Sequence, residues 1–314
     1  MTDLSVLVTG ATGFAGSHLL DLLAGSGVAV TAWHRPGGTP PKPRAAVRWR
    51  PVDLLDRREV SLALAETRPD HIYHCAGASH VGQSWRSSTS TFATNVRGTQ
   101  HLVEAIRRAG VETRLLVPSS ALVYAARPTP LQEDGALGPS SPYGVSKLAQ
   151  ELIANDDRQG LHVAIARAFN HVGPRQSPDF VASAFARRIA SIEAGNAPRE
   201  IRVGNLEARR DLTDVRDTVK AYRLIVERGR PGRIYNVCSG HAIAVRDLLD
   251  MLLARARVPI EVAVDSSLYR PNDNPMVVGD PSRLRDEIGW HPAIPIERTL
   301  DDLLEYWRRE LTRS

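Results

Sequence analysis

Tyr143 and Lys147 are the residues of this sequence whose types and spacing best suit proton transfer. Pro142 favours the first turn of a helix, and a helix that begins there places Tyr143 and Lys147 at i and i+4 on one face. A phenol beside an ammonium can give a proton to a carbonyl or take one from a hydroxyl. An exposed ion pair supplies only about 0–1 kcal/mol, whereas moving a tyrosine pKa from ~10 to ~7 requires about 4 kcal/mol. The pair therefore predicts chemistry where it is desolvated or assisted by another positive charge. Otherwise Tyr143 is an ordinary surface tyrosine.

A glycine-rich stretch near the N-terminus has the spacing needed to hold phosphate groups. Residues 4–8 form a short β-branched apolar run, residues 9–16 contain Gly-x-x-Gly-x-x-Gly, and a helical pattern of leucines follows. Glycines let the backbone approach a pyrophosphate, and free N–H groups at the start of a helix face the anion. A tight turn into a helix is the alternative. We predict a dinucleotide site formed by Gly10, Thr12, Gly13, Phe14, Ala15 and Gly16.

The end of the second expected strand, residues 28–33, indicates which dinucleotide is bound. NAD enzymes of this type normally carry an acid there, which holds the ribose 2′-hydroxyl. This chain has His34 and Arg35 instead, followed by a loop with Lys42 and Arg44. An arginine can pair with a 2′-phosphate through charge-assisted bonds. The sequence therefore predicts NADP(H), with a solvated loop position as the alternative for Arg35.

Strands and helices alternate over the first 170 residues. We expect strands at 47–52, 71–76, 114–117 and 163–166, and helices at 60–66, 92–109 and 143–156. This alternation predicts a Rossmann-type, doubly wound parallel sheet, whose ligands lie at the carboxyl ends of the strands. That edge brings the glycine-rich turn, Gly77 and Ser120 close to Tyr143. The Ser120 hydroxyl can then hydrogen-bond a reacting carbonyl, with Ser119 as the less favoured candidate.

Beyond residue 170 the sequence has short helices and many arginines and prolines, which predicts a smaller C-terminal α/β substrate lobe. A strand at 234–237 is expected to return to the sheet. Helices are expected at 214–227, 245–256, 282–288 and 299–311. This division assigns residues 1–169 and about 211–238 to a cofactor-binding domain. It assigns about 170–210 and 239–314 to the substrate lobe.

The composition narrows the classes of partner. The 314 residues are 42% hydrophobic and carry a formal net charge of +5, with arginines mixed among acids and only 5% aromatic residues. This mixture argues against nucleic-acid binding and suits a small polyanionic ligand. No apolar run reaches membrane-spanning length, and no cleavable signal precedes the first strand, so we expect a cytoplasmic protein without a membrane partner. The two cysteines and ten histidines show no metal-ligand spacing.

The chain resembles the extended short-chain dehydrogenase/reductase superfamily over nearly its whole length. The motifs that carry the resemblance are residues 9–16, 53–54, 95–99, 120–124 and 143–147, in the superfamily's order. The resemblance implies that Ser120, Tyr143 and Lys147 form a catalytic triad and that Lys147 also bonds the nicotinamide ribose. Asp53 would meet the adenine end of the cofactor. The remaining expected cofactor contacts are His34, Arg35, Leu54, Ala76, Gly77 and Ala78.

Motifs in the second half resemble enzymes that act on nucleotide-linked sugars. Residues 169–174, 203–211 and 235–240 are similar to the GDP-mannose 4,6-dehydratases, and more closely to the GDP-4-keto-6-deoxymannose reductases. The resemblance implies that Arg210 and Arg270 hold the pyrophosphate of the sugar nucleotide. Asp273 would then accept hydrogen bonds from its ribose, and Asn170 would also contact the substrate. Two arginines can hold a diphosphate in bidentate fashion, which agrees with these roles.

Leu122 stands where the dehydratases of this superfamily carry a glutamate that removes the proton α to the keto group. Neither Leu122 nor Ala121 can act as a base. Together with Arg35, this predicts an NADPH-dependent 4-keto reductase, with GDP favoured as the nucleotide and dTDP as the second choice. The alternatives are a GDP-mannose 4,6-dehydratase, a 4-epimerase that retains NAD, and a non-catalytic NADP-binding regulator.

The two long helices expected at 92–109 and 143–156 carry a prediction about assembly. Members of the superfamily pair such helices across a two-fold axis, which gives a four-helix bundle. By this resemblance we expect a homodimer.

Overall fold

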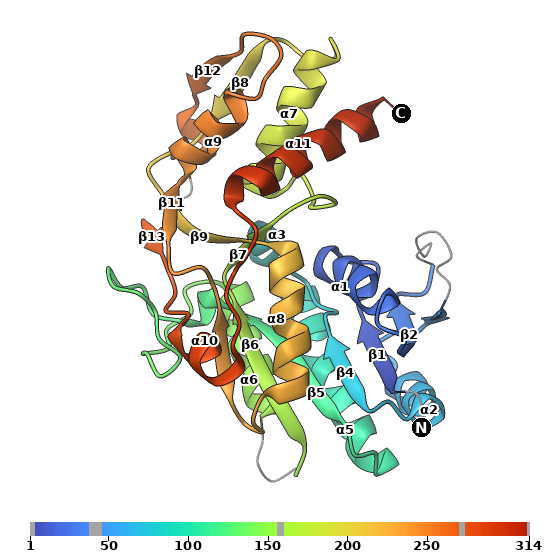
Figure 1. Ribbon diagram of the computed structural model, residues 1–314. Helices are drawn as coiled ribbons and strands as arrows, with labels where there is room; N and C mark the ends of the chain where they lie inside the picture. Colours follow the sequence, from blue (N-terminus) through green and yellow to red (C-terminus); the bar gives the residue numbers. More distant parts are fainter. Residues whose placement is uncertain (1–3, 38–45, 156–159, 270–273, 313–314) are drawn as a thin grey trace.

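The computed structural model describes residues 4–37, 46–155, 160–269 and 274–312. A seven-stranded parallel sheet forms the centre of the larger part of the molecule (Figure 1). Its order is β10-β6-β5-β4-β1-β2-β3, so the chain builds outward from β1 in one direction and then from β4 in the other. This confirms the predicted doubly wound sheet, whose switch point lies between β1 and β4. The strands are β1 Ser5–Thr9, β2 Ala29–His34, β3 Val47–Pro51, β4 His71–His74, β5 Arg114–Ser120, β6 His162–Ala168 and β10 Ile234–Val237.

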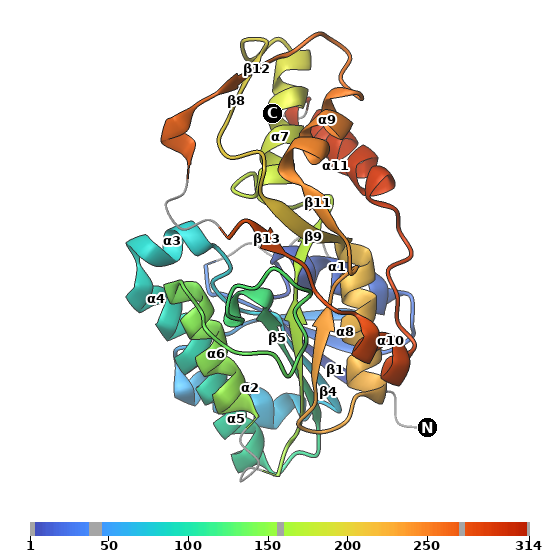
Figure 2. The ribbon, with the colours of Figure 1, turned by 90° about the vertical axis from the view of Figure 1, so that its left-hand side faces the viewer.

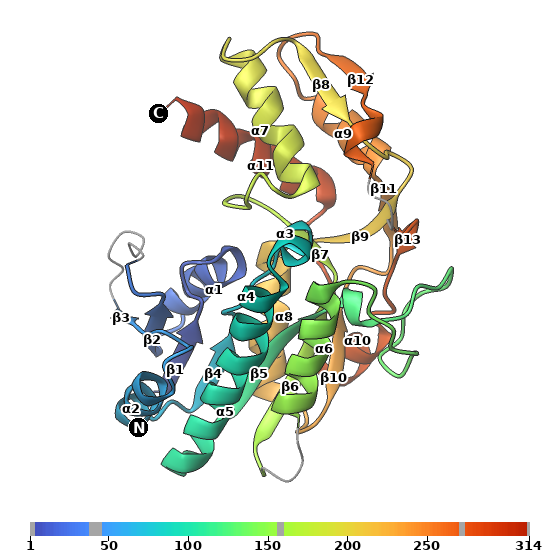
Figure 3. The same cartoon turned by 180° about the vertical axis from the view of Figure 1, so that it is seen from behind.

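Helices cover both faces of this sheet (Figures 1 and 3). On one face, apolar side chains of α1, α8 and α10 pack against the strands in a single buried cluster. On the other face, α2, α5 and α6 contribute to a second cluster. These helices are α1 Phe14–Ala24, α8 Val215–Arg228, α10 Ser282–Ile288, α2 Arg57–Thr67, α5 Gly98–Ala109 and α6 Pro142–Ala154.

The prediction of one continuous α-helix over residues 92–109 is wrong. The structure has α4 Ser88–Phe92, a π-helical turn at Ala93–Arg97 and then α5. The wider turn points Asn95 inward, where it is fully buried and hydrogen-bonds the backbone of Ala78 and the hydroxyl of Ser146. Such π-turns often serve to redirect a side chain at a functional site.

The smaller part of the molecule has its own apolar core, formed around α7 Val181–Glu193, α9 Val245–Leu253 and α11 Ile296–Leu311 (Figure 2). Two short sheets accompany these helices. The first contains β7 Asn170–Val172, β9 Arg209–Asp214, β11 Ala242–Ala244 and β13 Met276–Val277. The second pairs β8 Glu200–Val203 with β12 Glu261–Val264. The sequence predicted α9 and α11 but neither α7 nor these strands.

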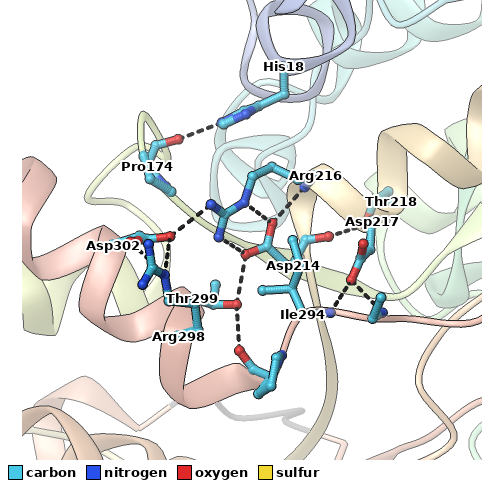
Figure 4. A network of polar contacts seen from close by, with 12 residues as sticks. His18, Pro174, Asp214, Arg216, Asp217, Thr218, Ile294, Arg298, Thr299 and Asp302 are labelled. Atoms are coloured by element: carbon cyan, nitrogen blue, oxygen red, sulfur yellow. Dashed lines mark hydrogen bonds and ion pairs between the residues drawn. The ribbon is translucent and has the colours of Figure 1, made fainter. Parts of the chain in front are cut away.

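A buried carboxylate fastens α11 to α8 (Figure 4). Asp214 caps the start of α8 and accepts hydrogen bonds from the Arg216 backbone, the Arg216 guanidinium and the Thr299 hydroxyl of α11. Arg216 also pairs with Asp302, one turn further along α11. Because Asp214 is 1% exposed, these contacts form a shielded link between the two parts of the molecule.

The remaining helical segments are short: α3 Val81–Arg86, a 3-10 turn at Ala121–Val123 and another at Ser266–Leu268. Among the described residues, no helix is both long and apolar enough to cross a bilayer.

Candidate active site

Helix α6 begins where the sequence predicts, and the helix face that carries Lys147 is buried. Ser141 caps the helix by accepting a hydrogen bond from the Gly144 N–H at 3.1 Å, and Pro142 occupies the first turn. Ser146, Lys147 and Gln150 are buried, whereas Leu152 lies on the exposed face. The helix start therefore fixes which residues of α6 face the carboxyl ends of the strands.

Gly144 allows the start of α6 to lie directly against the turn that follows β5. A Cβ atom added at Gly144 would lie 2.4 Å from the carbonyl oxygen of Leu122, closer than real side chains approach backbone. This contact brings Ser120, the last residue of β5, beside Tyr143. The Ser120 hydroxyl is close enough to the phenol to oppose the rise in the pKa of Tyr143, and Ser120 accepts from the Leu122 N–H at 3.2 Å. Ser119, the less favoured candidate, has a buried hydroxyl without a hydrogen-bond partner in the structure.

Burial shifts the two titrating groups of α6 in opposite directions. Burial of the phenol raises the pKa of Tyr143 to about 12, against the opposing effect of the Ser120 hydrogen bond. Burial lowers the pKa of Lys147 to about 8, against the opposing effect of the Glu151 charge. Near neutral pH the phenol therefore holds its proton and the ammonium holds its charge. This pair suits the donation of a proton to an oxygen that develops negative charge.

The Lys147 ammonium is held by two neutral carbonyl oxygens. Its Nζ donates to the Pro118 carbonyl at 2.6 Å and to Gln150 Oε1 at 2.5 Å. An ammonium has three N–H donors, so one remains for a ligand. The loop after β4 lies close by, since a Cβ atom added at Gly77 would be 4.0 Å from Nζ. Asn95 holds that loop by bonding both the N–H and the carbonyl of Ala78.

The glycine-rich turn fits a pyrophosphate. Gly10 has φ +62°, and an added Cβ would lie 2.5 Å from the backbone of Ala76, so β1 and β4 approach closely here. At Gly16 an added Cβ would lie 2.3 Å from the Gly10 carbonyl, which fixes α1 against the turn. Gly13 is exposed and caps α1 without a side chain. The first-turn N–H groups, including those of Phe14, Ala15 and Gly16, are therefore placed to face an anion.

The residues expected at the adenine end lie beside this turn. The Ala11 N–H donates to the Trp33 carbonyl at 3.2 Å, and the Val52 N–H donates to the His34 carbonyl at 2.9 Å. These bonds bring the ends of β1, β2 and β3 together, with Asp53 and Leu54 next in the chain. Asp53 Oδ1 accepts from the Leu55 N–H at 2.9 Å, and Arg35 is exposed.

On the substrate side, Asn170 and Arg210 lie on neighbouring strands. β7 pairs with β9 so that Asn170 is opposite Leu212, two residues from Arg210. The Arg210 guanidinium donates to the Asn274 carbonyl at 2.8 Å. Arg270 and Asp273 lie outside the described residues, so the structure places only half of the expected substrate contacts. No group of three or more His, Cys, Asp or Glu side chains positioned for a metal occurs within the described ranges.

Sequence reasoning missed Gln150 of α6 and the polar residues of other elements that extend its hydrogen bonding. Gln150 lies three residues after Lys147, and His74 and Thr99 continue the hydrogen bonding towards β1. Only the helical spacing of Gln150 was a usable signal. His74 and Thr99 are distant in sequence and meet through the fold alone.

Comparison with known proteins agrees with the geometry. Residues 7–303 match the family model described as GDP-mannose 4,6 dehydratase. The chain is 34% identical over 307 residues to the GDP-6-deoxy-D-mannose reductase of Pseudomonas aeruginosa, which covers 96% of each chain. It is 27% identical over 344 residues to the GDP-mannose 4,6-dehydratase of Vibrio cholerae, which covers 95% of this chain and 92% of the relative.

Two solved structures are similar throughout. RMD from Pseudomonas aeruginosa complexed with NADPH has a TM-score of 0.85 and 32% identity, over 98% of this chain and 99% of that one. MoeE5 in complex with UDP-glucose and NAD has a TM-score of 0.86 and 31% identity, over 98% and 99% of the two chains.

Proposed function

The chain belongs to the GDP-mannose 4,6-dehydratase family of the extended short-chain dehydrogenases/reductases, and from this premise we propose that it uses NADPH to reduce the 4-keto group of a nucleotide-linked 4-keto-6-deoxyhexose. GDP-4-keto-6-deoxymannose is the favoured substrate and a dTDP-linked sugar the second candidate. The observation that carries the proposal is that Tyr143 and Lys147 are both protonated near neutral pH, while a neighbouring position in the site lacks a side chain that could act as a base.

That position is Leu122. Its N–H donates to the Ser120 hydroxyl, and its carbonyl oxygen lies against Gly144 at the start of α6. A side chain at position 122 therefore belongs to the active-site turn. Elimination of water across C5 and C6 needs a base for the C5 proton, and a leucine cannot act as one. The nearby carboxylate of Glu151 is held by Arg167 at 2.8 Å in a buried ion pair. This supports reduction over dehydration.

The chain's own residues manage the proton in the proposed reaction. Bound NADPH would supply the hydride for the keto carbon. Tyr143 gives its phenolic proton to the former carbonyl oxygen, which becomes the C4 hydroxyl. The Ser120 hydroxyl and the Lys147 charge then stabilise the phenolate until it regains a proton from water. A phenol with a pKa of about 12 still donates readily, because an alkoxide is a stronger base than a phenolate.

The positions of the described residues support a set of proposed binding roles, and the roles of Arg270 and Asp273 rest on the sequence resemblance alone. We assign the pyrophosphate of the cofactor to the turn at 10–16, the 2′-phosphate to Arg35 with His34, and the adenine end to Asp53 and Leu54. Ala76, Gly77 and Ala78 border the nicotinamide half beside Lys147. Asn170 and Arg210 receive the sugar nucleotide, together with Arg270 and Asp273.

The direct test supplies purified protein with NADPH and either GDP-4-keto-6-deoxymannose or its dTDP-linked counterpart. NADPH oxidation is followed by absorbance and the product is identified by NMR. We expect one NADPH consumed per sugar reduced, with GDP preferred. A second reaction contains GDP-mannose and NADP⁺, and we expect it to stay unchanged. Appearance of a 4-keto-6-deoxy sugar there would assign the chain as a dehydratase, and interconversion of sugars without net NADPH use would assign it as an epimerase.

We also infer that the protein is a homodimer. Helix α6 exposes Val145 and, at 68%, Leu152, although the opposite face of the same helix is buried in the molecule. A leucine exposed to this extent on a helix that lies beside α4 and α5 fits an interface between two copies (Figure 3).

A further inference from the structure

A continuous chain of buried hydrogen bonds runs from β1 to Lys147. It passes through Thr9 of β1, His74 of β4, Thr99 of α5 and Gln150 of α6, and none of these side chains is more than 1% exposed. The bonds measure 2.8 Å from Thr9 to His74, 2.9 Å from His74 to Thr99, and 2.8 Å from Gln150 to Thr99. The last bond joins Gln150 to Lys147 at 2.5 Å.

The direction of each bond is determined, starting at Thr99. Its hydroxyl hydrogen is donated to the Asn95 carbonyl at 2.7 Å, and a carbonyl can only accept. Both remaining partners of the Thr99 oxygen must therefore be donors. His74 donates from Nε2, and Gln150 donates from its amide nitrogen.

The tautomer of His74 follows from this. Burial lowers the pKa of His74 to about 3, aided by the charge on Lys147, so the ring is neutral and has one N–H. Because Nε2 holds that hydrogen, Nδ1 accepts from the Thr9 hydroxyl. The Thr9 oxygen in turn accepts from the Ala76 N–H at 3.2 Å. In this one arrangement, every side-chain oxygen and nitrogen of this series of hydrogen bonds has a partner.

The arrangement decides which end of the Gln150 amide meets Lys147. Since the nitrogen faces Thr99, the carbonyl oxygen must face the ammonium. We propose that Gln150, oriented by Thr99 and His74, is a positioning residue that holds the Lys147 ammonium in place and keeps it charged. The inference deepens the proposed function, because it gives a source for the charge that assists Tyr143.

The other groups that face Lys147 do not supply this contact. Glu151 on α6 is paired with Arg167 of β6. Tyr143 is a neutral phenol, and burial raises the pKa of Cys75 to about 12, so its thiol is neutral as well. His74 is neutral, as argued above. Gln150 and the Pro118 carbonyl are therefore the direct acceptors for Nζ.

Lys147 can be titrated directly, because the sequence contains only three lysines, Lys42, Lys147 and Lys220. Protein that carries ¹³C at the lysine ε-carbon should give three NMR signals, and Lys147→Arg identifies the one from Lys147. We expect it to titrate near pH 8 in the wild type. Gln150→Met, which keeps the shape but removes the oxygen, should lower that pKa by about one unit. Gln150→Glu should raise it, because a carboxylate stabilises the charged form.

The control is Gln100→Met, because Gln100 is an exposed glutamine of α5 that contacts Glu104. It should leave the Lys147 titration unchanged. The basic limb of the pH profile of kcat should move with the NMR value in each Gln150 variant, by about tenfold in proton concentration for the Met variant. A purely structural role would instead lower the melting temperature and leave both pKa values in place.

An unchanged Lys147 pKa in folded Gln150→Met would overturn the inference. If that variant does not fold, Thr99→Val tests the same point, since it removes the acceptor that orients Gln150 and should also lower the pKa. The titration needs neither cofactor nor sugar. It can therefore fail while the reductase assignment holds, and it can succeed if the substrate proves to be a different one.

Discussion

At the scale of single residues, burial determines what Tyr143 and Lys147 can do. Burial raises the pKa of the Tyr143 phenol to about 12, against the opposing effect of Ser120, so the phenol keeps a proton to donate across the neutral range. The ammonium is desolvated as well, yet two carbonyl oxygens stabilise its charge. An ordinary surface tyrosine, the alternative open from the sequence, would not have its pKa raised by burial in this way.

Tyr143→Phe tests the donor. Removing the hydroxyl leaves the packing but no proton for the developing alkoxide, so kcat should fall by at least the ~10²–10⁴-fold that general acid catalysis supplies. NADPH affinity, measured by fluorescence titration, should survive, because we assign the phosphate contacts to the glycine-rich turn. Tyr269→Phe, at an exposed tyrosine, serves as the control. Near-wild-type turnover in Tyr143→Phe would remove this residue from the mechanism.

Arg35→Ala tests the choice of cofactor. If the guanidinium pairs with the 2′-phosphate, NADPH binding should weaken by roughly 1.5–3 kcal/mol while NADH binding stays nearly the same. Isothermal titration with both cofactors measures the two changes. Arg58→Ala removes an exposed arginine from α2 and controls for the loss of net charge. An equal loss for both cofactors would mean that Arg35 does not read the phosphate.

At the scale of elements, close backbone contacts join the pieces of the site. Gly10 lets β1 meet the end of β4, Gly16 seats α1 on the turn, and Gly144 seats α6 against the turn after β5. Each contact would be blocked by a single methyl group. The positions of Ser120 and Tyr143 relative to each other thus depend on a residue that takes no part in the chemistry.

Gly144→Ala should separate these two elements. Its methyl group would lie 2.4 Å from the Leu122 carbonyl, so the helix start or the turn must move. We expect a loss of about 1–3 kcal/mol in unfolding free energy, as for other overpacked sites, and at least a tenfold lower kcat. Gly25→Ala has nothing within 4 Å of the added methyl and should be nearly neutral. Urea unfolding and steady-state kinetics of both variants decide the point.

His18 of α1 contacts the loop at Pro174, and we expect its titration to make the stability of the protein depend on pH. Its Nε2 lies 2.8 Å from the Pro174 carbonyl, and burial lowers its pKa to about 4 (Figure 4). Between pH 6.5 and 4 the unfolded chain binds more protons at this site than the folded one, so stability falls as the pH falls. His18→Gln keeps an N–H donor but does not titrate. Urea unfolding at pH 7 and pH 5 should therefore show a loss about 1–2 kcal/mol smaller in the variant than in the wild type.

The exposed His291→Gln is the control for this comparison, and it should show the wild-type loss. Equal losses in the wild type and His18→Gln would exclude His18 as a source of the pH dependence.

The sequence predicted the large sheet and the start of α6 better than it predicted the smaller part. Pro142 with a capping serine marks the start of α6, and apolar β-branched runs mark most strands of the sheet. Asn95 is different: its inward position requires a π-turn that depends on Ala78 and Ser146, and the local pattern reads as ordinary helix. Strands such as β7 and β13, with three and two residues, exist because β9 pairs with them, and periodicity cannot show that.

The orientation of Gln150 likewise depends on His74 and Thr99, which meet only in the folded chain. The roles of Arg270 and Asp273 and the domain boundaries stay predictions.

At the scale of the whole molecule, the Asp214 network joins the two parts (Figure 4), and α6 lies on the outside of the larger part (Figure 3). Val145 and Leu152 thus form an exposed apolar surface on α6 that no segment of the described chain covers. This is the surface we assign to the second copy.

Leu152→Asp tests the dimer. A carboxylate in the centre of an apolar interface is costly to bury, so the variant should be a monomer at micromolar concentration by light scattering, whereas we expect the wild type to be a dimer. Leu62→Asp, at a leucine of α2 that is 53% exposed, should leave the dimer intact. A monomeric wild type would contradict the assignment of this face.

The late return of β10 to the sheet matters while the protein is being synthesised. β6 is complete at Ala168, but its outer neighbour begins at Ile234, 66 residues later. At ~5–20 residues per second, the ribosome needs roughly 3–13 s to produce that stretch. During this interval the nascent chain presents β6 as a bare strand edge, which can pair with other chains. Slow translation between these strands, or premature termination there, would therefore favour aggregation of an otherwise well-formed N-terminal half.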